Sequence, residues 1–379
     1  MKADTRMNIT FVISSLSSGG AERVMSTMAN YRAQNNWQIT LITLDSTASD
    51  FYTLHPDVKR IALGLMDDSN NPWMAIRNNL TRLIKLRRAI KSSKPDIVIS
   101  FVDRMNIMTL LATRGLGLKV IVSEHTDPSC HNCGSVWSWL RNITYPWAQA
   151  VTVLSPSVRQ WMEERIGNGK VQVIHNPILK NNKEIDEKSW PNILGEHKRL
   201  RTIISMGRLS AEKGFDLLIT AFAKVVHSNP EWLLVIFGVG KDRDALIQLS
   251  IKLGVEERVL LPGRVNNPMQ LLPKAELFVM SSRYEGFGMA LCEAMACGLP
   301  VISFDCPSGP REIIRDGIDG LLVPPEDVNA LAAAMSQLMT DESLRKRLAS
   351  RAPEVLERFG MEKVMGMWEN LVKSVANQD

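Results

Sequence analysis

Residues 277–303 read LFVMSSRYEGFGMALCEAMACGLPVIS, and this stretch decides the fold. The short apolar run at 277–280 predicts a buried strand, residues 289–297 predict a helix, and the run at 300–303 predicts a second strand. A strand, a helix and a further strand in this order form a βαβ unit, whose two strands are parallel. The stretch therefore predicts a parallel sheet that is covered by helices.

The same alternation extends over most of the chain. In the first half the predicted strands are 8–14, 38–44, 96–100, 119–123, 150–154 and 171–174, with helices such as 21–34 and 105–116. In the second half the predicted strands are 202–206, 233–237, 258–261, 277–280 and 300–303, with helices at 213–227, 242–253, 289–297 and 328–339. The predicted fold class is α/β, with two doubly wound Rossmann-like domains that face each other across a cleft.

The alternation breaks once, in a polar stretch that we interpret as an interdomain linker at residues 181–199. We therefore expect a first domain at residues 1–180 and a second domain at residues 200–360. Residues 361–379 are expected to form a C-terminal helix that packs back on the first domain. The length of 379 residues agrees with two domains rather than one.

Composition excludes several classes of protein. The net charge of +5 is too small to indicate nucleic-acid binding, although it suits an anionic surface or phosphorylated ligands. The 5 cysteines are an odd number at scattered positions, which favours a reducing compartment. No apolar window reaches the length of a membrane-spanning helix, and the run at 9–16 is a strand rather than a signal peptide. We expect a cytoplasmic protein whose contact with a membrane is peripheral.

Ligands of doubly wound sheets bind beyond the carboxyl ends of the strands, so the loops there are the candidate sites. After the first predicted strand, SSGGAE places Gly19 and Gly20 before a helix, where main-chain N–H groups favour an anion. After the strand at 202–206, GRLSAEKG contains Arg208 and Lys213, and two cations beside a helix start suit a diphosphate. The alternatives are a tight turn for the first loop and an exposed basic loop for the second.

The loop in the opening stretch is the most specific of the three. Glu285 precedes the helix and Glu293 lies within it, at about two turns if the helix begins near residue 288. Carboxylates accept hydrogen bonds from neighbouring hydroxyl groups, which suits ribose or a hexose. The alternative is a carboxylate at the helix entry together with a solvated glutamate.

Taken together, the Gly-Gly loop, His125, the Gly-Arg…Lys-Gly segment and the Glu-x7-Glu motif resemble family 4 of the retaining glycosyltransferases, which have the GT-B fold. The resemblance covers nearly the whole chain, and its motifs between residues 207 and 325 are the most specific. It implies an acceptor-binding first domain and a second domain that binds a nucleotide sugar.

The resemblance also implies roles for single residues. Arg208 and Lys213 would hold the donor diphosphate and stabilise the leaving group, and Glu285 would contact the sugar hydroxyls. His125 would lie beside the transferred sugar, with Glu124 next to it as a group that orients the ring or contacts the acceptor. The donor-binding residues implied in this way are Gly19, Gly20, Gly263, Arg264, Val265, Gly286, Phe287, Gly288, Met289 and Glu293.

Neither a metal nor a cofactor is expected. Asp242 and Asp244 have the spacing of a metal motif, but they open a predicted helix, where the helix dipole favours carboxylates. Cys130 and Cys133 form a Cys-x-x-Cys pair without a second pair at suitable spacing, so we interpret it as an ordinary loop. The resemblance implies retention by front-face attack of the acceptor hydroxyl.

Residues 72–94 predict an amphipathic helix, with Ile76, Leu80, Leu83, Leu86 and Ile90 on one face. Its basic residues suit phospholipid headgroups or a lipid-linked pyrophosphate, and the alternative is a surface helix docked on the sheet. The residues predicted for the acceptor and the membrane are Arg77, Lys85, Arg88 and Lys91. Trp137, Trp139 and Trp147 are either core residues or membrane contacts.

The sequence thus predicts an enzyme that transfers a hexose or N-acetylhexosamine from a nucleotide sugar. The resemblance to the family implies that the nucleotide is UDP. The expected acceptor is a sugar on a polyprenyl diphosphate at the inner face of the cytoplasmic membrane, in lipopolysaccharide, O-antigen, capsule or related glycan assembly. The alternatives are a non-hydrolysing sugar-nucleotide epimerase and a non-catalytic nucleotide-sugar-binding protein.

Overall fold

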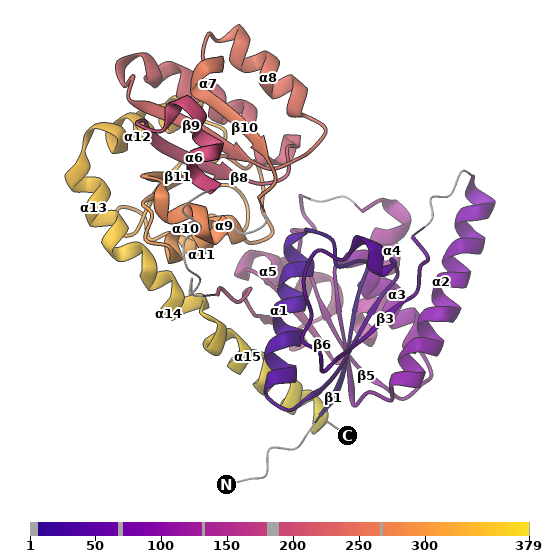
Figure 1. The fold of residues 1–379 in the computed structure, drawn as a ribbon. Helices are drawn as coiled ribbons and strands as arrows, with labels where there is room; N and C mark the ends of the chain where they lie inside the picture. Colours follow the sequence, from indigo (N-terminus) through magenta and orange to yellow (C-terminus); the bar gives the residue numbers. More distant parts are fainter. Residues whose placement is uncertain (1–6, 67–70, 131–132, 180–188, 266–267, 379) are drawn as a thin grey trace. The chain divides into compact units, whose positions relative to one another are not determined.

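The computed structural model describes residues 7–66, 71–130, 133–179, 189–265 and 268–378. The chain divides into two compact units. Unit 1 comprises Met1–Asn176 together with Val364–Asp379, and unit 2 comprises Pro177–Lys363. Each unit contains one parallel sheet with helices around it (Figure 1).

The sheet of unit 1 has the strand order β3-β2-β1-β4-β5-β6-β7, and its described pairings are parallel. The strands are β1 (Asn8–Ile13), β2 (Gln38–Thr43), β3 (Val58–Ala62), β4 (Ile97–Phe101), β5 (Lys119–Ser123), β6 (Ala150–Val153) and β7 (Val171–Val173). The helices are α1 (Gly20–Gln34), α2 (Pro72–Ser93), α3 (Asp103–Thr113), α4 (Ser135–Thr144), α5 (Pro156–Ile166) and α15 (Met361–Ala376), with 3-10 turns η1 (Thr47–Ser49) and η2 (Tyr145–Trp147). The order of connection reverses between β1 and β4, which is where such sheets bind ligands.

The central strands are covered on both faces, and this explains their nearly continuous apolar sequences. All five residues of β4 (IVISF) are buried, including the hydroxyl of Ser100, which donates to Asn106 Oδ1 at 2.7 Å. Buried polar groups of this kind need a partner inside the protein.

The C-terminal helix α15 packs on unit 1. Trp368 stacks on Phe101 of β4, with ring centroids 6.0 Å apart. Arg32 of α1 donates to the carbonyl of Met365 at 2.6 Å and forms an ion pair with Glu369 at 2.8 Å. The last helix therefore completes the core of the unit that contains the first residues of the chain.

The helix α2 corrects one prediction from the sequence. Leu86 and Ile90 are fully buried and Leu83 is partly buried, but Ile76 and Leu80 are 63% and 56% exposed. The reason is length: α2 has 22 residues, about 33 Å at 1.5 Å per residue, whereas its neighbour α3 has 11, about 16 Å. The amino-terminal half of α2 extends beyond the helix on which it packs (Figure 1).

The sheet of unit 2 has the order β10-β9-β8-β11-β12-β13, and its connections reverse between β8 and β11. The strands are β8 (Arg201–Met206), β9 (Trp232–Phe237), β10 (Val259–Gly263), β11 (Leu277–Met280), β12 (Val301–Phe304) and β13 (Leu321–Val323). The helices are α6 (Ser189–Leu194), α7 (Phe215–Val225), α8 (Arg243–Lys252), α9 (Pro268–Leu271), α10 (Met289–Ala296), α11 (Pro310–Ile313), α12 (Val328–Thr340), α13 (Glu342–Arg351) and α14 (Val355–Phe359). The 3-10 turns are η3 (Gly195–His197), η4 (Ala211–Lys213), η5 (Val226–Ser228), η6 (Glu256–Arg258), η7 (Leu272–Lys274) and η8 (Ala352–Glu354).

Residues 181–188 of the predicted linker lie outside the described residues. The following residues form α6 and η3, although the sequence showed no apolar period there. Trp190 and Leu194 are four residues apart, and both are buried. This spacing places them on one face of a helix, which explains why the segment is helical.

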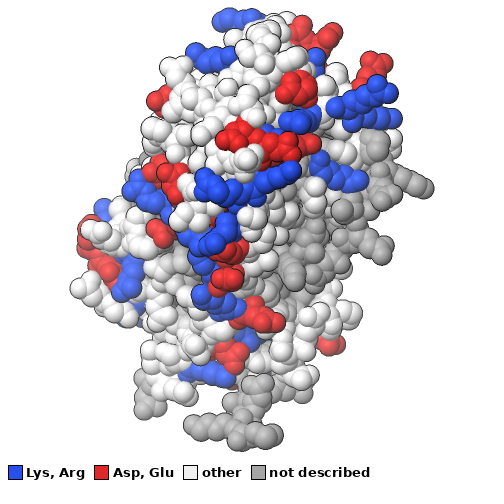
Figure 2. All heavy atoms as spheres, turned by 90° about the vertical axis from the view of Figure 1, so that its left-hand side faces the viewer, with Lys and Arg blue, Asp and Glu red and all other residues white. Residues whose placement is uncertain are grey.

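Charge is mixed on the face that Figure 2 shows, where blue Lys and Arg side chains lie beside red Asp and Glu side chains. Ion pairs within one helix include Lys346 with Glu342 on α13 and Lys373 with Glu369 on α15. Such exposed pairs contribute little to stability. Among the described residues on this face, basic side chains alternate with acidic ones rather than forming the basic patch that is typical of nucleic-acid binding.

Candidate functional site

In unit 2, the loop after β8 and the loop after β11 are joined by main-chain contacts. The N–H of Arg283 donates to the carbonyl of Glu212 at 2.8 Å, and Ser281 Oγ donates to the carbonyl of Lys213 at 3.0 Å. Gly214 lies between η4 and α7 with φ of 60°, and a Cβ atom there would come within 2.0 Å of the Ser281 carbonyl oxygen. Only glycine allows this approach, so the two loops form one rigid platform.

The platform brings together Lys213 and Glu285, which lie 72 residues apart in the sequence. Lys213 Nζ donates to Glu285 Oε1 at 2.6 Å, and Ser282 Oγ donates to the same oxygen at 2.6 Å. The side chains of Lys213 and Glu285 are 24% and 11% exposed, so both can still reach a ligand. A lysine ammonium has three donors, and this contact uses one of them.

Arg208 lies in the same loop as Lys213 and is exposed. Both cations act on Glu212. Desolvation raises the pKa of Glu212, but the hydrogen bond from Ser210 and the charges of Arg208 and Lys213 outweigh it, so that the net shift is downward. Arg208 and Lys213 therefore both lie near enough to Glu212 to act on its charge, and among the described residues no hydrogen bond or ion pair joins Arg208 to Glu285.

Glu293 is the fifth residue of α10, because this helix begins at Met289. The residue therefore lies little more than one turn into the helix, not two turns as predicted, and it is 3% exposed. The alternative of a solvated glutamate is thus wrong. The loop before the helix is held closely: a Cβ atom on Gly309 would come within 2.1 Å of the Phe287 carbonyl oxygen. The loops after β11 and β12 are consequently close together, and the N–H of Glu285 also donates to the carbonyl of Pro307 at 3.5 Å.

Gly263, Arg264 and Val265 lie at the end of β10. Gly263 has φ of 94°, and its carbonyl accepts from the N–H of Gly238 at 2.9 Å. Arg264 is exposed and Val265 is partly buried. The residues predicted for the donor in unit 2 are therefore all in loops at the carboxyl edge of one sheet or in the helix that follows.

In unit 1, His125 follows β5. Its Nε2 atom lies 3.1 Å from Ser123 Oγ, and its ring lies 4.2 Å from the ring of Phe101, between centroids. Desolvation by these neighbours lowers the pKa of His125, although part of the residue reaches the surface. The imidazole is therefore neutral near pH 7, and it can exchange hydrogen bonds without carrying a charge.

Glu124 is 1% exposed and belongs to a buried polar network that the sequence did not reveal. Tyr145 Oη donates to Glu124 Oε2 at 2.7 Å, and Arg141 Nε lies 3.8 Å from the same oxygen. Arg141 also pairs with Asp103 at 3.5 Å. Glu124 thus anchors α4 to the His125 loop. The sequence suggested that it orients the imidazole ring, but its described contacts are with Tyr145 and Arg141 instead.

The network lies beside a strained turn. Val102 follows β4 with φ of 74°, which is rare for a β-branched residue and costs energy. Its N–H donates to the carbonyl of Ser123 at 3.1 Å, which ties the ends of β4 and β5 together. One sequence signal existed for the network: Arg141 falls four residues after Trp137 in α4, and on the buried side of the helix its charge requires a partner.

Stability should depend on pH through Glu124. Desolvation, opposed by Arg141, raises the pKa of Glu124 to about 7 from its ordinary value of 4.5. The folded protein thus binds a proton that the unfolded chain releases above pH 4.5, so this stabilisation is complete below 4.5 and is lost as pH rises through 7, up to about 3 kcal/mol. The melting temperature of Glu124→Gln relative to wild type should therefore increase between pH 5 and pH 8. A difference that stays constant over this range would contradict the assignment.

Gly19 and Gly20 lie where the first strand turns into α1. Gly19 is the residue before the helix, and its carbonyl accepts from Tyr52 Oη at 3.1 Å. Gly20 is exposed, with no heavy atom near the position of a Cβ. Both are at the carboxyl edge of the sheet, as predicted for a ligand loop.

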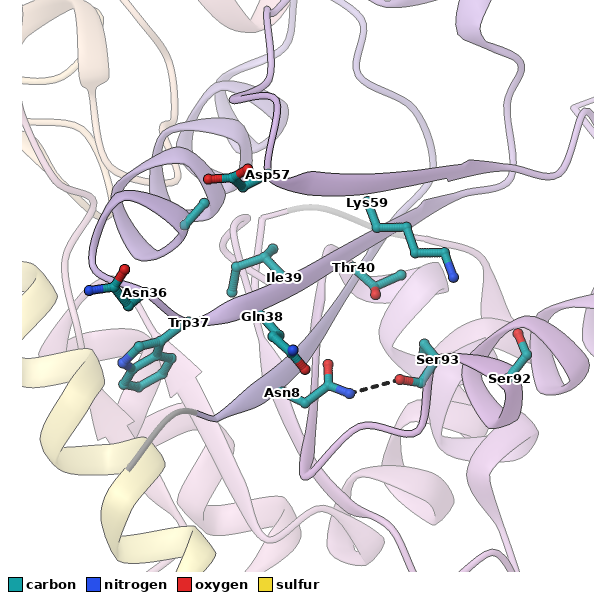
Figure 3. A pocket seen from close by; sticks show the side chains of 11 residues that line it. Asn8, Asn36, Trp37, Gln38, Ile39, Thr40, Asp57, Lys59, Ser92 and Ser93 are labelled. Carbon is teal, nitrogen blue, oxygen red and sulfur yellow. Dashed lines mark hydrogen bonds between the residues drawn. The ribbon is translucent and has the colours of Figure 1, made fainter. Parts of the chain in front are cut away.

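A hollow of about 420 Å³ lies elsewhere in unit 1 (Figure 3). Its lining includes Asn8, Gln38 and Lys59 from β1, β2 and β3, and Ser93 from the end of α2. Asn8 Nδ2 donates to the carbonyl of Ser93 at 2.8 Å. Because Asn8 and Gln38 begin their strands, the hollow lies at the amino edge of the sheet, opposite the edge where doubly wound sheets bind ligands.

Two further motifs stay outside the candidate site. Asp242 precedes α8 and Asp244 lies in its first turn, as the dipole interpretation predicts. Within the described part of the chain, no group of three or more His, Cys, Asp and Glu residues is arranged to hold a metal. Cys130 is exposed and Cys133 is buried, where it accepts from Arg141 at 3.2 Å; residues 131 and 132 between them lie outside the described residues.

Two family descriptions match adjoining parts of the chain. "Glycosyltransferase Family 4" matches residues 18–179, and "Glycosyl transferases group 1" matches residues 186–355. The matched ranges correspond to the main parts of unit 1 and unit 2. The first range contains β2 to β7 and begins after β1, and the second range contains β8 to β13.

Two curated relatives align over almost the whole chain. One is the "GalNAc-alpha-(1->4)-GalNAc-alpha-(1->3)-diNAcBac-PP-undecaprenol alpha-1,4-N-acetyl-D-galactosaminyltransferase" of Campylobacter jejuni, which is 30% identical over 98% of this chain and 99% of the relative. Another is the amylovoran biosynthesis glycosyltransferase AmsD of Erwinia amylovora, which is 26% identical over 94% and 96%.

Solved structures share the fold. HepE of Anabaena, solved with UDP and glucose, has a TM-score of 0.79 at 20% identity and covers 97% of this chain and 100% of its own. The sucrose-phosphate synthase of Thermosynechococcus elongatus has a TM-score of 0.84 at 18% identity, with coverages of 98% and 99%.

Proposed function

The chain belongs to glycosyltransferase family 4 and has the GT-B fold of two Rossmann-like domains, and from this premise we propose which sugar transfer it catalyses. It moves a hexose or N-acetylhexosamine from a UDP-linked donor to a sugar hydroxyl on a polyprenyl-diphosphate-linked acceptor. The observation that carries the donor half of this proposal is the Lys213–Glu285 pair on the rigid platform of unit 2. The acceptor half is supported by the undecaprenol-linked substrate in the name of the Campylobacter relative.

The chemistry follows from the platform. In the transfer, the bond between the anomeric carbon and the diphosphate oxygen breaks, and the acceptor oxygen forms a new bond to the same carbon. Negative charge develops on the leaving diphosphate, where the remaining donors of Lys213 and the guanidinium of Arg208 would stabilise it. In a front-face reaction, the proton of the acceptor hydroxyl passes to the departing phosphate oxygen and the anomeric configuration is retained.

The two glutamates would serve the alcohol groups of the donor. The described hydrogen bonds to Glu285 all involve Oε1, so its other oxygen can accept from sugar hydroxyls. Glu293 would accept from the ribose, and Gly263 to Val265 would contact the base. The roles of Gly19, Gly20 and His125 toward the donor are proposed from family resemblance, as is the absence of a metal requirement.

A panel of nucleotide sugars tests the function. Each is incubated with the purified protein and polyprenyl-diphosphate-linked saccharides, and the lipid-linked product is identified by mass and by the configuration of its new bond. We expect one donor to lengthen the acceptor by one α-linked sugar with release of UDP. Interconversion of the nucleotide sugar without an acceptor would identify an epimerase, and binding without turnover would identify a non-catalytic protein.

The membrane is the expected location of the acceptor, and α2 carries a surface suited to it. Among the described residues, no helix combines the length and the hydropathy needed to cross a bilayer. α2 exposes Trp73 at 82%, and the exposed Ile76, Leu80 and Ile84 follow it at spacings of three and four residues. The sequence of this helix contains no acidic residue, and its exposed cations are Arg77, Lys85, Arg88 and Lys91. Exposed apolar groups beside cations bind the surface of an anionic bilayer.

A second exposed stripe lies on α4, which also packs on α3. Val136, Trp139 and Ile143 are 67%, 61% and 39% exposed, and their spacing of three and four residues places them on one face. Trp137 and Trp147 are instead packed against the core, so only Trp139 of the three tryptophans is a membrane candidate. We propose that α2 and α4 hold the enzyme peripherally at the inner face of the cytoplasmic membrane.

Charge reversal on α2 should weaken this attachment. The double change Lys85→Glu and Arg88→Glu alters the charge by four units, and each cation near an anionic surface is worth about 1 kcal/mol. Flotation with vesicles that contain phosphatidylglycerol should show at least a tenfold loss of bound protein. The matched control, Lys224→Glu with Lys252→Glu, makes the same change of charge on α7 and α8 and should bind normally. Equal binding of both variants would contradict the proposed surface.

A further inference from the structure

Arg283 lies two residues before Glu285, and its guanidinium contacts three segments of unit 2. Nη1 and Nη2 donate to Asp216 Oδ1 at 3.0 Å and Oδ2 at 2.7 Å, which makes a bidentate pair. Nη1 also donates to the carbonyl of Ala211 at 2.6 Å, and Nε donates to Glu326 Oε2 at 2.9 Å. The planar fork of donors fixes the direction of these contacts as well as their distance.

These contacts hold the chain on both sides of Lys213. Ala211 begins the turn η4 that ends at Lys213, and Asp216 lies in the first turn of the helix that follows. The main-chain N–H of Arg283 adds a contact to the carbonyl of Glu212 at 2.8 Å. The residue thus joins its own loop, which leads to Glu285, to the loop that carries the lysine.

The exposure of these groups argues against a mainly stabilising role. The side chains of Arg283, Asp216 and Glu326 are 27%, 45% and 55% exposed. Ion pairs between groups this exposed to water contribute little to folding. The larger effect of the Arg283 contacts is therefore on the positions of Lys213 and Glu285, because these two residues come from different loops and need a fixed separation.

We propose that Arg283 is a positioning residue of the donor site, which sets Lys213 against Glu285 by clamping the two loops together. This inference rests on the function proposed above, in which Lys213 receives the leaving diphosphate. Arg283 contacts no substrate in this role and acts only through the residues that it holds.

The direct test is Arg283→Gln, assayed by transfer kinetics and thermal unfolding. We expect kcat to fall about tenfold with a smaller change in KM, because small displacements of a catalytic group lower the rate more than binding. The matched control is Arg315→Gln. Arg315 also binds two carboxylates, Asp319 at 2.6 Å and Glu354 at 2.8 Å, and is 35% exposed, but it touches no predicted site residue. Arg315→Gln should lose at least as much melting temperature, because it removes a partner from Asp319, which is 0% exposed, and only Arg283→Gln should lose kcat.

A double-mutant cycle separates position from general damage. If Arg283 acts through Lys213, the variant Lys213→Ala/Arg283→Gln should turn over as fast as Lys213→Ala alone, because the side chain to be positioned is missing. If Arg283 only stabilises the fold, the factors by which Lys213→Ala and Arg283→Gln each lower turnover should multiply in the double variant. Asp216→Asn should reproduce the loss of Arg283→Gln and add nothing to it.

The outcomes distinguish this inference from the proposed function. A kcat for Arg283→Gln equal to that of Arg315→Gln, or losses that multiply in the cycle, would overturn the positioning role while Lys213 keeps its own. Near-normal turnover in Lys213→Ala would instead overturn the diphosphate assignment, and the positioning role would fail with it.

Discussion

Turnover should fall about a hundredfold or more when Lys213 is replaced by alanine, as it does when one donor to developing charge is removed from an active site. The lysine is held 2.6 Å from Glu285, so its ammonium is in place before the diphosphate begins to leave. Its removal has a second effect: Glu285, which is 11% exposed, then faces the diphosphate as an uncompensated negative charge. The measurement is the rate of UDP release with saturating acceptor.

Lys224→Ala is the control for this variant, because Lys224 is an exposed lysine of the neighbouring helix α7. It should turn over at the wild-type rate. Loss of the same size in both variants, or near-normal turnover in Lys213→Ala, would mean that the charge of Lys213 does not serve the leaving group.

Gly214→Ala should destabilise unit 2 by about 2–5 kcal/mol and disorder the platform. The left-handed backbone costs an alanine about 1 kcal/mol or more, and forcing a methyl group into a packed contact adds 1–3 kcal/mol. Here the methyl group would meet the Ser281 carbonyl oxygen at 2.0 Å, and a main-chain atom in a sheet-end loop cannot yield as a flexible side chain can. Thermal unfolding and transfer activity should both be strongly impaired.

Gly254→Ala isolates the backbone cost. Gly254 has φ of 66°, close to the 60° of Gly214, but no heavy atom lies within 4 Å of the position of its Cβ. The variant should lose about 1 kcal/mol and keep its activity. Equal effects at the two glycines would show that the contact with Ser281 is unimportant.

Much of the fold could be predicted from the sequence, because parallel strands covered on both faces have continuous apolar sequences. β4 and β9 are fully buried and were predicted from such runs. The strands β3 and β13 were missed for the complementary reason. Both lie at a sheet edge, where β3 carries the polar residues Lys59 and Arg60 and β13 has 3 residues. Edge strands are often short or polar, and they then leave no apolar run to detect.

The candidate site could be predicted only where motifs follow strands. Arg208, Lys213 and Glu285 could be named as candidates because strand ends predict ligand loops, and the structure places them in loops after β8 and β11. The contacts that surround these residues could not be predicted. Arg283 and Asp216, for example, are 67 residues apart, and nothing in the local sequence marks the two as a pair. The exposure of Ile76 could not be predicted from the sequence either. Periodicity shows which residues share a face of a helix, but not how far the neighbouring helix extends along that face.

The packing of α15 on unit 1 has a consequence for the newly made protein. The ribosome releases residues 7–176 before unit 2, whereas the helix that covers Phe101 and Arg32 of this unit emerges after unit 2. Unit 2 is one continuous segment and has all its residues available before that point. The half that is synthesised second can therefore finish folding first, while the earlier half keeps bare apolar surface that a chaperone would protect.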